Sequence, residues 1–261
     1  MEKLHHELWI THAVNAVFGP IAAAILRLFG RPVPDGAEVI PDYIAMLIVI
    51  AIALTALSLV VRSRLSVENP GSLQVVFEDF IAAFQGLLSD FVGPKGPRYL
   101  PLVVSVFLTI WLSNMSGLVP GLMAPTSNLN VTLGCALTVW VYYHLQGIRE
   151  QGPLAYLLHF AHVPDGTPLA LKLFMVPLIF VIEIIGHTAR VMSLSLRLFG
   201  NVFGEELVII ILASLVPFIV PLPMMFLGLL TGTLQALIFA ILTMVYLGGA
   251  VAVEHHDEAH P

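Results

Sequence analysis

The last third of the chain is almost continuously apolar, from Pro168 to Val253 of 261 residues. A proline cluster, VPFIVPLP, interrupts this stretch, and about 48 residues separate it from Pro168. As one helix these residues would be about 72 Å long at 1.5 Å per residue, whereas the hydrocarbon core of a bilayer is about 30 Å thick. The sequence therefore leaves two solutions. Either two upright spans turn near Gly200, or one steeply tilted helix is followed by a second helix from about Met224.

The composition is that of an integral membrane protein. Hydrophobic residues make up 58% of the chain and charged residues 11%, whereas soluble domains carry about 25% charged residues. The net charge of -6 comes largely from the ends and the loops, so we expect no nucleic-acid partner. The single cysteine, Cys135, excludes an intramolecular disulfide framework. The start, MEKLHHELW, lacks the pattern of a signal peptide, so we expect the first span to direct insertion.

Three further apolar runs are long enough to cross a bilayer: Tyr43–Val61, Tyr99–Val119 and Val131–Gln146. They predict an all-α polytopic membrane protein with a single membrane domain. In chain order we expect an outer N-terminal segment (1–38) with a short helix from Leu8 to Leu28, a first span (42–62), an amphipathic helix (70–92), an upright helical hairpin (98–148), a long helical pair (168–250) and a tail (254–261).

The segment 70–92 has the pattern of an amphipathic helix. Apolar residues recur at intervals of three and four, and polar residues stand between them. The apolar positions are Leu73, Val76, Phe77, Phe80, Ile81, Phe84, Leu87, Leu88 and Phe91. The pattern predicts a helix that lies on the membrane surface, and it fits packing on lipid and packing on protein equally well.

The distribution of positive charge predicts the orientation. Arg62, Arg64, Lys95, Arg98 and Arg149 fall on one side of the membrane if the first span runs inward, and the loop 120–130 on the other side has no basic residue. Because basic residues concentrate on the cytoplasmic side, the N-terminus is predicted outside, with the amphipathic helix and the C-terminus cytoplasmic.

Polar residues line one face of the expected long helix. At 100° per residue they fall within one narrow stripe: Glu183, His187, Arg190, Arg197, Asn201 and Glu205. Such residues in a membrane either pair to hold helices together or mark an ion pathway. Glu206 points away from Arg197, and a structural zipper would not need a carboxylate there, which favours the pathway. Arg190 fits either an inner exit or a pair with Glu183.

The chemistry of arginine limits what Arg197 can do. Its side chain does not release a proton in proteins, so it acts as a fixed positive charge. Opposite a mobile carboxyl group it would favour the ionised form and make that group release its proton. Proton carriers must then be glutamate, histidine or water.

Two stretches carry a resemblance to a known family. SLSLRLFGNVFGEEL (193–207), followed by TLQALIFAILTMVYL (233–247), resembles subunit a of the bacterial F-type rotary ATP synthase, and WLSNMSGLVPG and PTSNLNVTLGCAL match it further upstream. The resemblance implies a cytoplasmic surface helix, an upright hairpin and two long tilted helices that form a hairpin against a ring of c subunits. It therefore favours one tilted helix over two upright spans. It also implies the bacterial inner membrane, peripheral-stalk b subunits and the other ATP synthase subunits as partners, and no cofactor or metal.

The resemblance also implies roles for individual residues. Arg197 matches the family's essential arginine, which faces the carboxylates of the c-ring. Glu206 matches a carboxylate of the outer half-channel, and Glu183 an acidic group toward the cytoplasmic exit. Asn201 and Gln235 match polar neighbours of that arginine, and Asn114 matches the asparagine of the family's NxxGLxP block. Together with His187 and Arg190 of the stripe, these residues are the predicted site.

The sequence departs from the family pattern at Gly228. Many members carry histidine or glutamate there as the partner of the position that Glu206 occupies. The outer half-channel must then rely on Glu206 with water or borrow another group, for example Asn128 or Asn130.

The implied function is that of a proton-translocating stator without catalysis of its own. Protons would pass Glu206, neutralise a c-ring carboxylate, and leave near Glu183 after ionisation opposite Arg197. The alternative is the stator of a Na+-coupled or other rotary motor. An intramembrane protease would need a catalytic constellation, and a secondary transporter would be expected to show inverted repeats, and the sequence shows neither. The histidines of HFAH (His159, His162) and His144 do not have the spacing of a metal site. The tail EHHDEAHP is short and charged, and metal binding by it is left open as an alternative.

Overall fold

The computed structural model of the chain describes residues 9–30, 39–66, 70–119, 121–159, 168–215 and 219–251. The elements in this part of the chain are all helical, so the predicted all-α class is confirmed. They are α1 (Trp9–Leu28), α2 (Asp42–Ser63), α3 (Ser72–Val92), η1 (Gly96–Tyr99), α4 (Leu100–Ser116), η2 (Pro125–Ser127), α5 (Leu129–Gln151), α6 (Pro153–His159), α7 (Leu169–Leu215) and α8 (Pro221–Val251).

The long polar-striped segment is one helix. α7 has 47 residues and continues through Gly200 without a break, although Pro177 lies inside its first half. Its length is about 70 Å at 1.5 Å per residue, more than twice the thickness of a hydrocarbon core. To stay within the hydrocarbon core α7 would have to be steeply tilted. The solution with two upright spans that turn near Gly200 is wrong, because the helix continues through this residue. α8 follows as the second long helix.

The helices long and apolar enough to cross a membrane are five in the described part of the chain. They are α1, which is the short helix expected in the outer N-terminal segment, α2, the segment Gly96–Ser116, Leu173–Leu215 and α8. α5 contains the predicted span Val131–Gln146 but is not in this set. Threonines, His144 and Gln146 lower the mean hydropathy of α5. The helix packs on α7 and α8.

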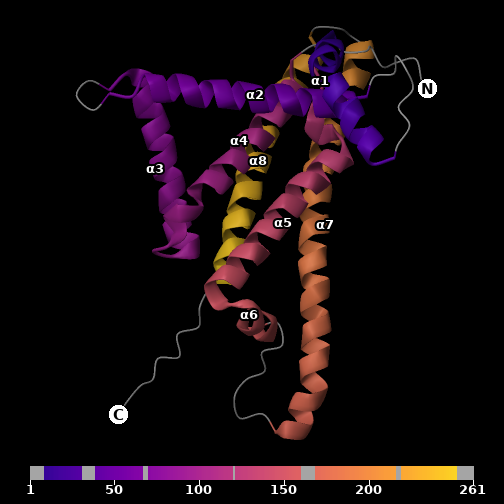
Figure 1. The fold of residues 1–261 in the computed structure, drawn as a ribbon. Helices are drawn as coiled ribbons and strands as arrows, with labels where there is room; N and C mark the ends of the chain where they lie inside the picture. The colour runs from indigo at the N-terminus through magenta and orange to yellow at the C-terminus, as the bar shows by residue number, and fades with distance from the viewer. Residues whose placement is uncertain are drawn as a thin grey trace.

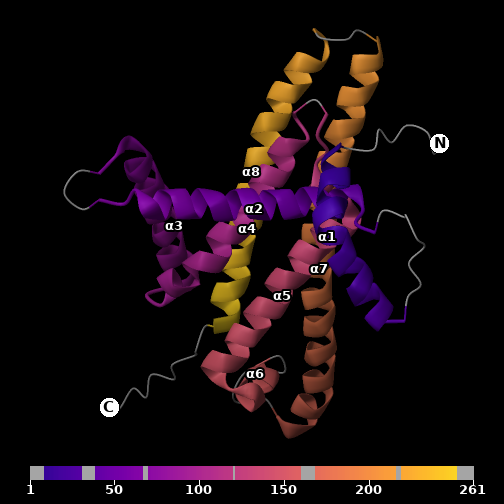
Figure 2. The same cartoon turned by 45° about the horizontal axis from the view of Figure 1, so that its top comes forward.

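α8 is the centre of the packing. It contacts α3, α4, α5 and α7, and Ala236, Phe239, Ala240, Met244 and Leu247 are completely buried along it. α7 and α8 lie side by side and are joined at one end, as the orange and yellow helices of Figure 2 show. The expected hairpin consists of α4 and α5. Both helices pack on α8, so α8 holds the two together.

α2 and α3 run in different directions from the α7–α8 pair. In Figure 1, α2 lies across the long axis of α7, and α3 leaves the end of α2 at a steep angle. Phe84 and Leu88 of α3 are buried, and Phe84 stacks in a tilted arrangement with Phe107 of α4 at a centroid distance of 5.1 Å. This part of the amphipathic face therefore packs on protein, which answers one question that the sequence left open.

The N-terminal helix is tied to α2 by polar contacts. The side-chain amide of Asn15 donates to the carbonyl of Ile40 at 3.0 Å and its oxygen accepts from the same residue's N–H at 2.9 Å. Thr11 donates to Asp42 at 2.5 Å. These three bonds bring α1 against the start of α2.

Close contact between α5, α6 and α8 depends on Gly147. A Cβ atom at this position would overlap the ring of Tyr156 and lie 2.9 Å from the carbonyl oxygen of Ala250. Gly134, on the same helix, has no such neighbour within 4 Å.

We therefore expect Gly147→Ala to destabilise the chain by about 1–3 kcal/mol, because overpacking forces the neighbouring backbone to shift. Gly134→Ala is the matched control, and it should be neutral or stabilising because alanine favours the helix. Thermal denaturation of the purified chain in detergent measures both. Equal melting temperatures for the two variants would contradict the packing argument.

Candidate functional site

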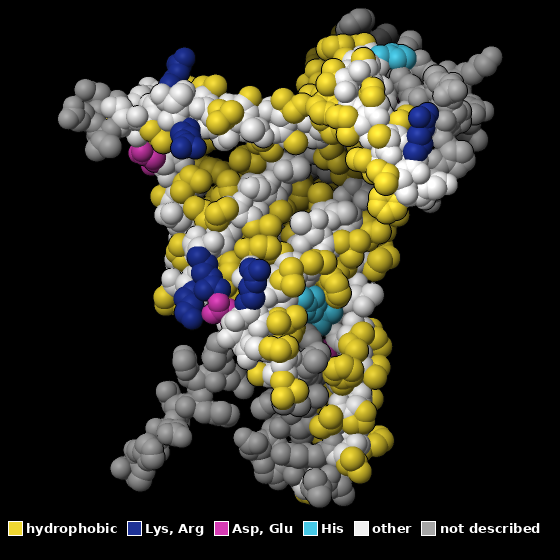
Figure 3. Space-filling model, in the orientation of Figure 1, with side chains coloured by type: hydrophobic (Ala, Val, Ile, Leu, Met, Phe, Trp, Pro, Cys, Tyr) yellow, Lys and Arg dark blue, Asp and Glu magenta, His cyan; other side chains and the backbone are white. Residues whose placement is uncertain are grey.

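The polar stripe of α7 gathers into clusters on a largely apolar molecule. Most side chains visible in Figure 3 are hydrophobic, and Lys and Arg side chains gather near the two ends of α3. The stripe residues belong instead to α7, and their partners come from α5 and α8. The site is therefore built between helices.

The first cluster joins three predicted residues. Glu183 Oε1 lies 3.3 Å from His187 Nε2 and 3.6 Å from Arg190 Nη2. Arg190 therefore pairs with Glu183, and it also lines a hollow beside this carboxylate. A pair with Glu183 and a place at an inner exit are thus compatible for Arg190. This hollow, of about 350 Å³, is bounded by Tyr156, Glu183, His187, Arg190, Val245, Tyr246, Gly249 and Ala250. It can hold water beside a carboxylate and an imidazole, which are groups able to exchange protons.

Aromatic residues complete this cluster, and sequence reasoning missed them. The Tyr143 hydroxyl lies 2.8 Å from His187 Nδ1, and the guanidinium carbon of Arg190 lies 5.5 Å from the ring centroid of Tyr246. His144, considered above only for a metal site, lies with its Nδ1 2.7 Å from the Tyr156 hydroxyl. The available signal was the run of two tyrosines and a histidine in α5, which hydropathy alone does not distinguish from a plain span.

Arg197 stands alone in the middle of the stripe. Its side chain is exposed, and no hydrogen bond or ion pair joins its guanidinium to any other described residue. Exposed apolar side chains surround this part of α7 and α8, among them Leu196, Phe203, Leu234 and Ile238. A fixed charge on an apolar surface is costly in a bilayer unless a partner meets it.

Asn201 and Gln235 connect α7 to α8 just beyond Arg197. The amide nitrogen of Asn201 donates to Gln235 Oε1 at 2.9 Å. Gln235 is 3% exposed, and its own amide nitrogen has no acceptor in the described part of the chain. The two predicted neighbours of Arg197 are thus brought together, with one donor left to bind something else.

The second cluster explains the glycine at position 228. The Glu205 carboxylate occupies the space where a side chain at Gly228 would begin, and it accepts a hydrogen bond from Thr231 Oγ1 at 3.1 Å. A carboxylate from α7 therefore fills the place where the family resemblance leads us to expect a titratable side chain from α8. The helical periodicity places Glu205 in the stripe but assigns it no role.

Neither asparagine suggested for this place reaches it. Asn128 caps the start of α5, where its side chain accepts from the N–H of Asn130 at 2.9 Å. Asn130 borders a groove between α2, α4 and α5. Glu206 is half-buried on a different face of α7 from Arg197, and no hydrogen bond or ion pair to it occurs among the described residues.

Asn114 lies apart from the stripe. It is buried, donates to the carbonyl of Gly232 at 3.0 Å and accepts from Thr126 Oγ1 at 2.7 Å. These bonds hold the end of α4 to α8 and to η2. Asn114 therefore connects these three elements.

The histidine-rich segments of the sequence fall mostly outside the described residues. This holds for His162, the tail 254–261 and the side chain of His159. Within the described ranges no three His, Cys, Asp or Glu side chains are grouped as metal ligands.

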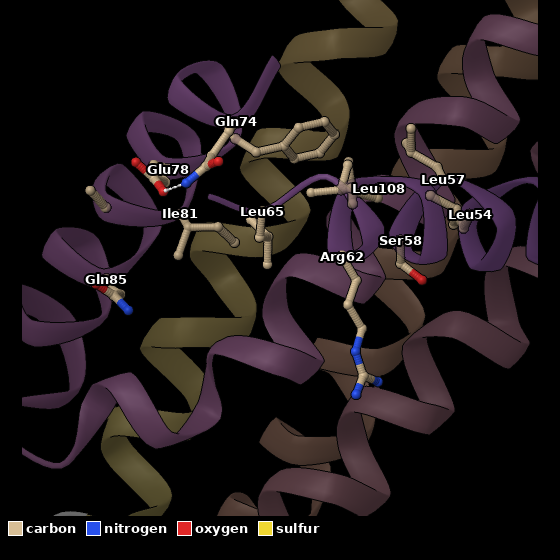
Figure 4. A pocket seen from close by; sticks show the side chains of 13 residues that line it. Leu54, Leu57, Ser58, Arg62, Leu65, Gln74, Glu78, Ile81, Gln85 and Leu108 are labelled. Atoms are coloured by element: carbon tan, nitrogen blue, oxygen red, sulfur yellow. Dashed lines mark hydrogen bonds between the residues drawn. The ribbon is translucent and has the colours of Figure 1, made fainter. Parts of the chain in front are cut away.

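A separate groove of about 540 Å³ lies between α2 and α3 (Figure 4). Leucines and isoleucine dominate its walls, and its one drawn hydrogen bond runs from Gln74 Nε2 to Glu78 Oε1 at 2.7 Å. Arg62 points away from this pair in Figure 4. The groove is lined by residues of α2, α3 and α4 and by Leu65, and it is separate from the polar stripe of α7.

Comparison with known proteins decides the family. Residues 43–248 match the ATP synthase A chain family. The chain belongs to this family. It is 42% identical to an ATP synthase subunit a of Syntrophotalea carbinolica over 211 residues. This aligned region covers 81% of this chain and 84% of the relative. It is 44% identical over 189 residues to that of Aliarcobacter butzleri (72% and 79% covered) and 40% identical over 219 residues to that of Geobacter sulfurreducens (84% and 89% covered).

The ATP synthase A chain family is the proton-channel stator component of the bacterial enzyme, a membrane subunit without catalysis of its own. The match begins in α2 and ends in α8, so it includes both clusters and Arg197. The resemblance drawn from the sequence motifs is confirmed, and with it the membrane setting and the association with other ATP synthase subunits.

The contacts of Asn114 predict a mainly structural effect of its removal. Asn114→Ala should lower the free energy of unfolding by about 1–3 kcal/mol, because Thr126 loses its buried acceptor. Asn130→Ala, at an exposed position on α5, is the comparison. Melting temperatures in detergent report the difference, and an unchanged value for Asn114→Ala would show that these bonds contribute little.

Proposed function

We propose that this chain forms two offset half-channels to the carboxylates of a c-ring, and that Arg197 separates them. The observation that carries the proposal is the position of Arg197, exposed and unpaired among described residues between two polar clusters on one helix. A partner carboxylate moving past it would be driven to ionise, and a free proton could not pass directly through its field.

The outer half-channel is formed by Glu206 and Glu205. Glu206 carries the role implied by the family motif, and Glu205 supplies the second titratable group through its place over Gly228. Thr231 orients Glu205 toward α8. Two carboxylates near one another on α7 can take up a proton from the outer side and deliver it to a c-ring carboxylate beside Arg197.

The inner half-channel is the hollow at Glu183, His187 and Arg190. These groups lie two to four helical turns before Arg197 on the same stripe of α7. A proton released opposite Arg197 reaches water in the hollow and then Glu183 or His187 before it leaves to the cytoplasm. Asn201 and Gln235 fix the spacing of α7 and α8 at the crossing point.

The proposed orientation places the N-terminus outside and the C-terminus in the cytoplasm. Basic residues stand at both ends of α3: Arg62 and Arg64 precede it, and Lys95 and Arg98 follow it. Lys95 Nζ lies 3.3 Å from Glu150 Oε2, and Arg98 pairs with the same carboxylate, so the end of α5 belongs to this side too. This supports α3 as a helix at the cytoplasmic surface. The peripheral-stalk b subunits are the further partners proposed.

Removal of the charge at Arg197 tests the central assignment. In vesicles carrying the complete ATP synthase, Arg197→Ala should reduce ATP-driven proton pumping by about 100-fold or more, because a preorganised charge is lost from the transfer site. Arg62→Ala, which removes an exposed arginine from α2, should pump within about twofold of the unaltered complex. Normal pumping by Arg197→Ala would overturn the proposal.

The outer half-channel is tested with isosteric carboxamides. Glu205→Gln and Glu206→Gln should each slow passive proton conductance through the membrane sector by about tenfold or more, since an amide cannot carry the proton. Glu78→Gln on α3 serves as the control because its carboxylate lies outside the proposed path. Conductance is followed by a pH-sensitive dye under an imposed potential. If only Glu206→Gln slows it, Glu205 is not part of the path.

A further inference from the structure

The imidazole of His187 is held at both nitrogens by different helices. Nε2 faces Glu183 Oε1 at 3.3 Å within α7, and Nδ1 faces the Tyr143 hydroxyl of α5 at 2.8 Å. His187 is 8% exposed and Tyr143 is 2% exposed. The contact between them is therefore a buried link between α5 and the proposed inner half-channel.

The neighbours of Nδ1 differ in what they can do with a proton. Arg190 Nη1 lies 3.4 Å from Nδ1, and a guanidinium can only donate a hydrogen bond. The Tyr143 hydroxyl can donate to a bare Nδ1 and can also accept from Nδ1–H. Of these two neighbours, Tyr143 is the one that can form a hydrogen bond with Nδ1 both when this nitrogen carries a proton and when it does not. Which tautomer is present depends on the bond at this nitrogen.

We propose that Tyr143 is a positioning residue of the proton path: its hydroxyl holds the His187 imidazole toward Glu183 in every protonation state and so allows His187 to pass protons. The proposal rests on the inner half-channel of the proposed function and names a residue that the polar stripe does not contain.

The proton balance of the step is simple. A charged imidazole donates Nδ1–H to the tyrosine oxygen and Nε2–H to Glu183. When the Nε2 proton moves to the carboxylate, His187 is left neutral with its remaining proton on Nδ1, still accepted by Tyr143. The carboxyl group of Glu183 then releases the proton to water in the hollow, and His187 accepts the next proton at Nε2. In ATP-driven pumping the same steps run in reverse.

The ring of Tyr143 is itself fixed by its surroundings. It lies 4.4 Å from the His144 ring and 6.2 Å from the Tyr246 ring, measured between centroids. His144 bonds to Tyr156 of α6, and its ring centroid lies 4.7 Å from that of His187. Among the described residues, the titratable and charged groups around the imidazole include Tyr143 and His144 of α5, Tyr156 of α6, Glu183 and Arg190 of α7, and Tyr246 of α8.

Tyr143→Phe removes the hydroxyl and keeps the ring, and Tyr142→Phe is the matched control. Tyr142 is the adjacent residue of the same helix, and its ring meets Tyr99 edge-on at 6.4 Å. In vesicles with the complete ATP synthase, we expect Tyr143→Phe to slow ATP-driven pumping by about tenfold, because a buried Nδ1–H loses its acceptor. Tyr142→Phe should stay within about twofold.

Two further measurements separate a proton-path role from a structural one. With the charged imidazole disfavoured, the pH at which pumping falls to half should move lower in Tyr143→Phe, whereas a loss of packing would reduce the rate equally at all pH values. In a His187→Ala background, Tyr143→Phe should add no further slowing, because the two residues act as one unit.

Unchanged pumping by Tyr143→Phe, equal slowing with and without His187, or failure of Tyr143→Phe to assemble would each overturn the inference. The last result would show that the hydroxyl is a structural tie. The proposed function fails separately, through normal pumping by Arg197→Ala. If Arg197→Ala abolishes pumping and Tyr143→Phe pumps normally, only the role of Tyr143 is lost.

Discussion

The length of α7 is the constraint on which the rest of the structure depends. A helix of 47 residues is more than twice as long as a hydrocarbon core is thick, so keeping it within the bilayer requires a steep tilt. A tilted helix spreads its side chains along the membrane as well as across it. Groups several turns apart on one stripe then stand at different positions along a neighbouring surface. In the proposed function, Glu183 and Glu205 therefore serve separate openings while they share a face of one helix. A shorter, upright helix would place the same residues in a single vertical file.

The sequence predicted the stripe because periodicity within one helix needs no knowledge of its neighbours. Rotation by 100° per residue brings Glu183, His187 and Arg190 to one face, and the structure joins the three at short distances. The apolar runs likewise predicted an all-helical membrane chain. Both inferences use local chemistry and the thickness of the bilayer, which are the same for any fold.

Relations between helices were harder to predict. The space over Gly228 is filled by Glu205 because of the rotation and register of α7 against α8, and neither sequence segment contains that information. Tyr143 and Tyr156 were missed for a different reason, since a tyrosine ring reads as apolar while its hydroxyl acts as a polar group at one end. The lower hydropathy of α5 has the same origin, because a helix that contributes to a polar cluster cannot also be a uniformly apolar span.

The central place of α8 has a mechanical meaning. A stator must resist the sideways push of the rotor it faces, and the helix that carries Arg197 is exposed along much of its length. α8 is packed against α3, α4, α5 and α7, and small residues such as Gly232 and Ala236 allow the backbones to approach. Under the proposed function, a sideways load on α7 passes through its contacts with α5 and α8 into the body of the subunit. Close-packed side chains bear such a load with little displacement.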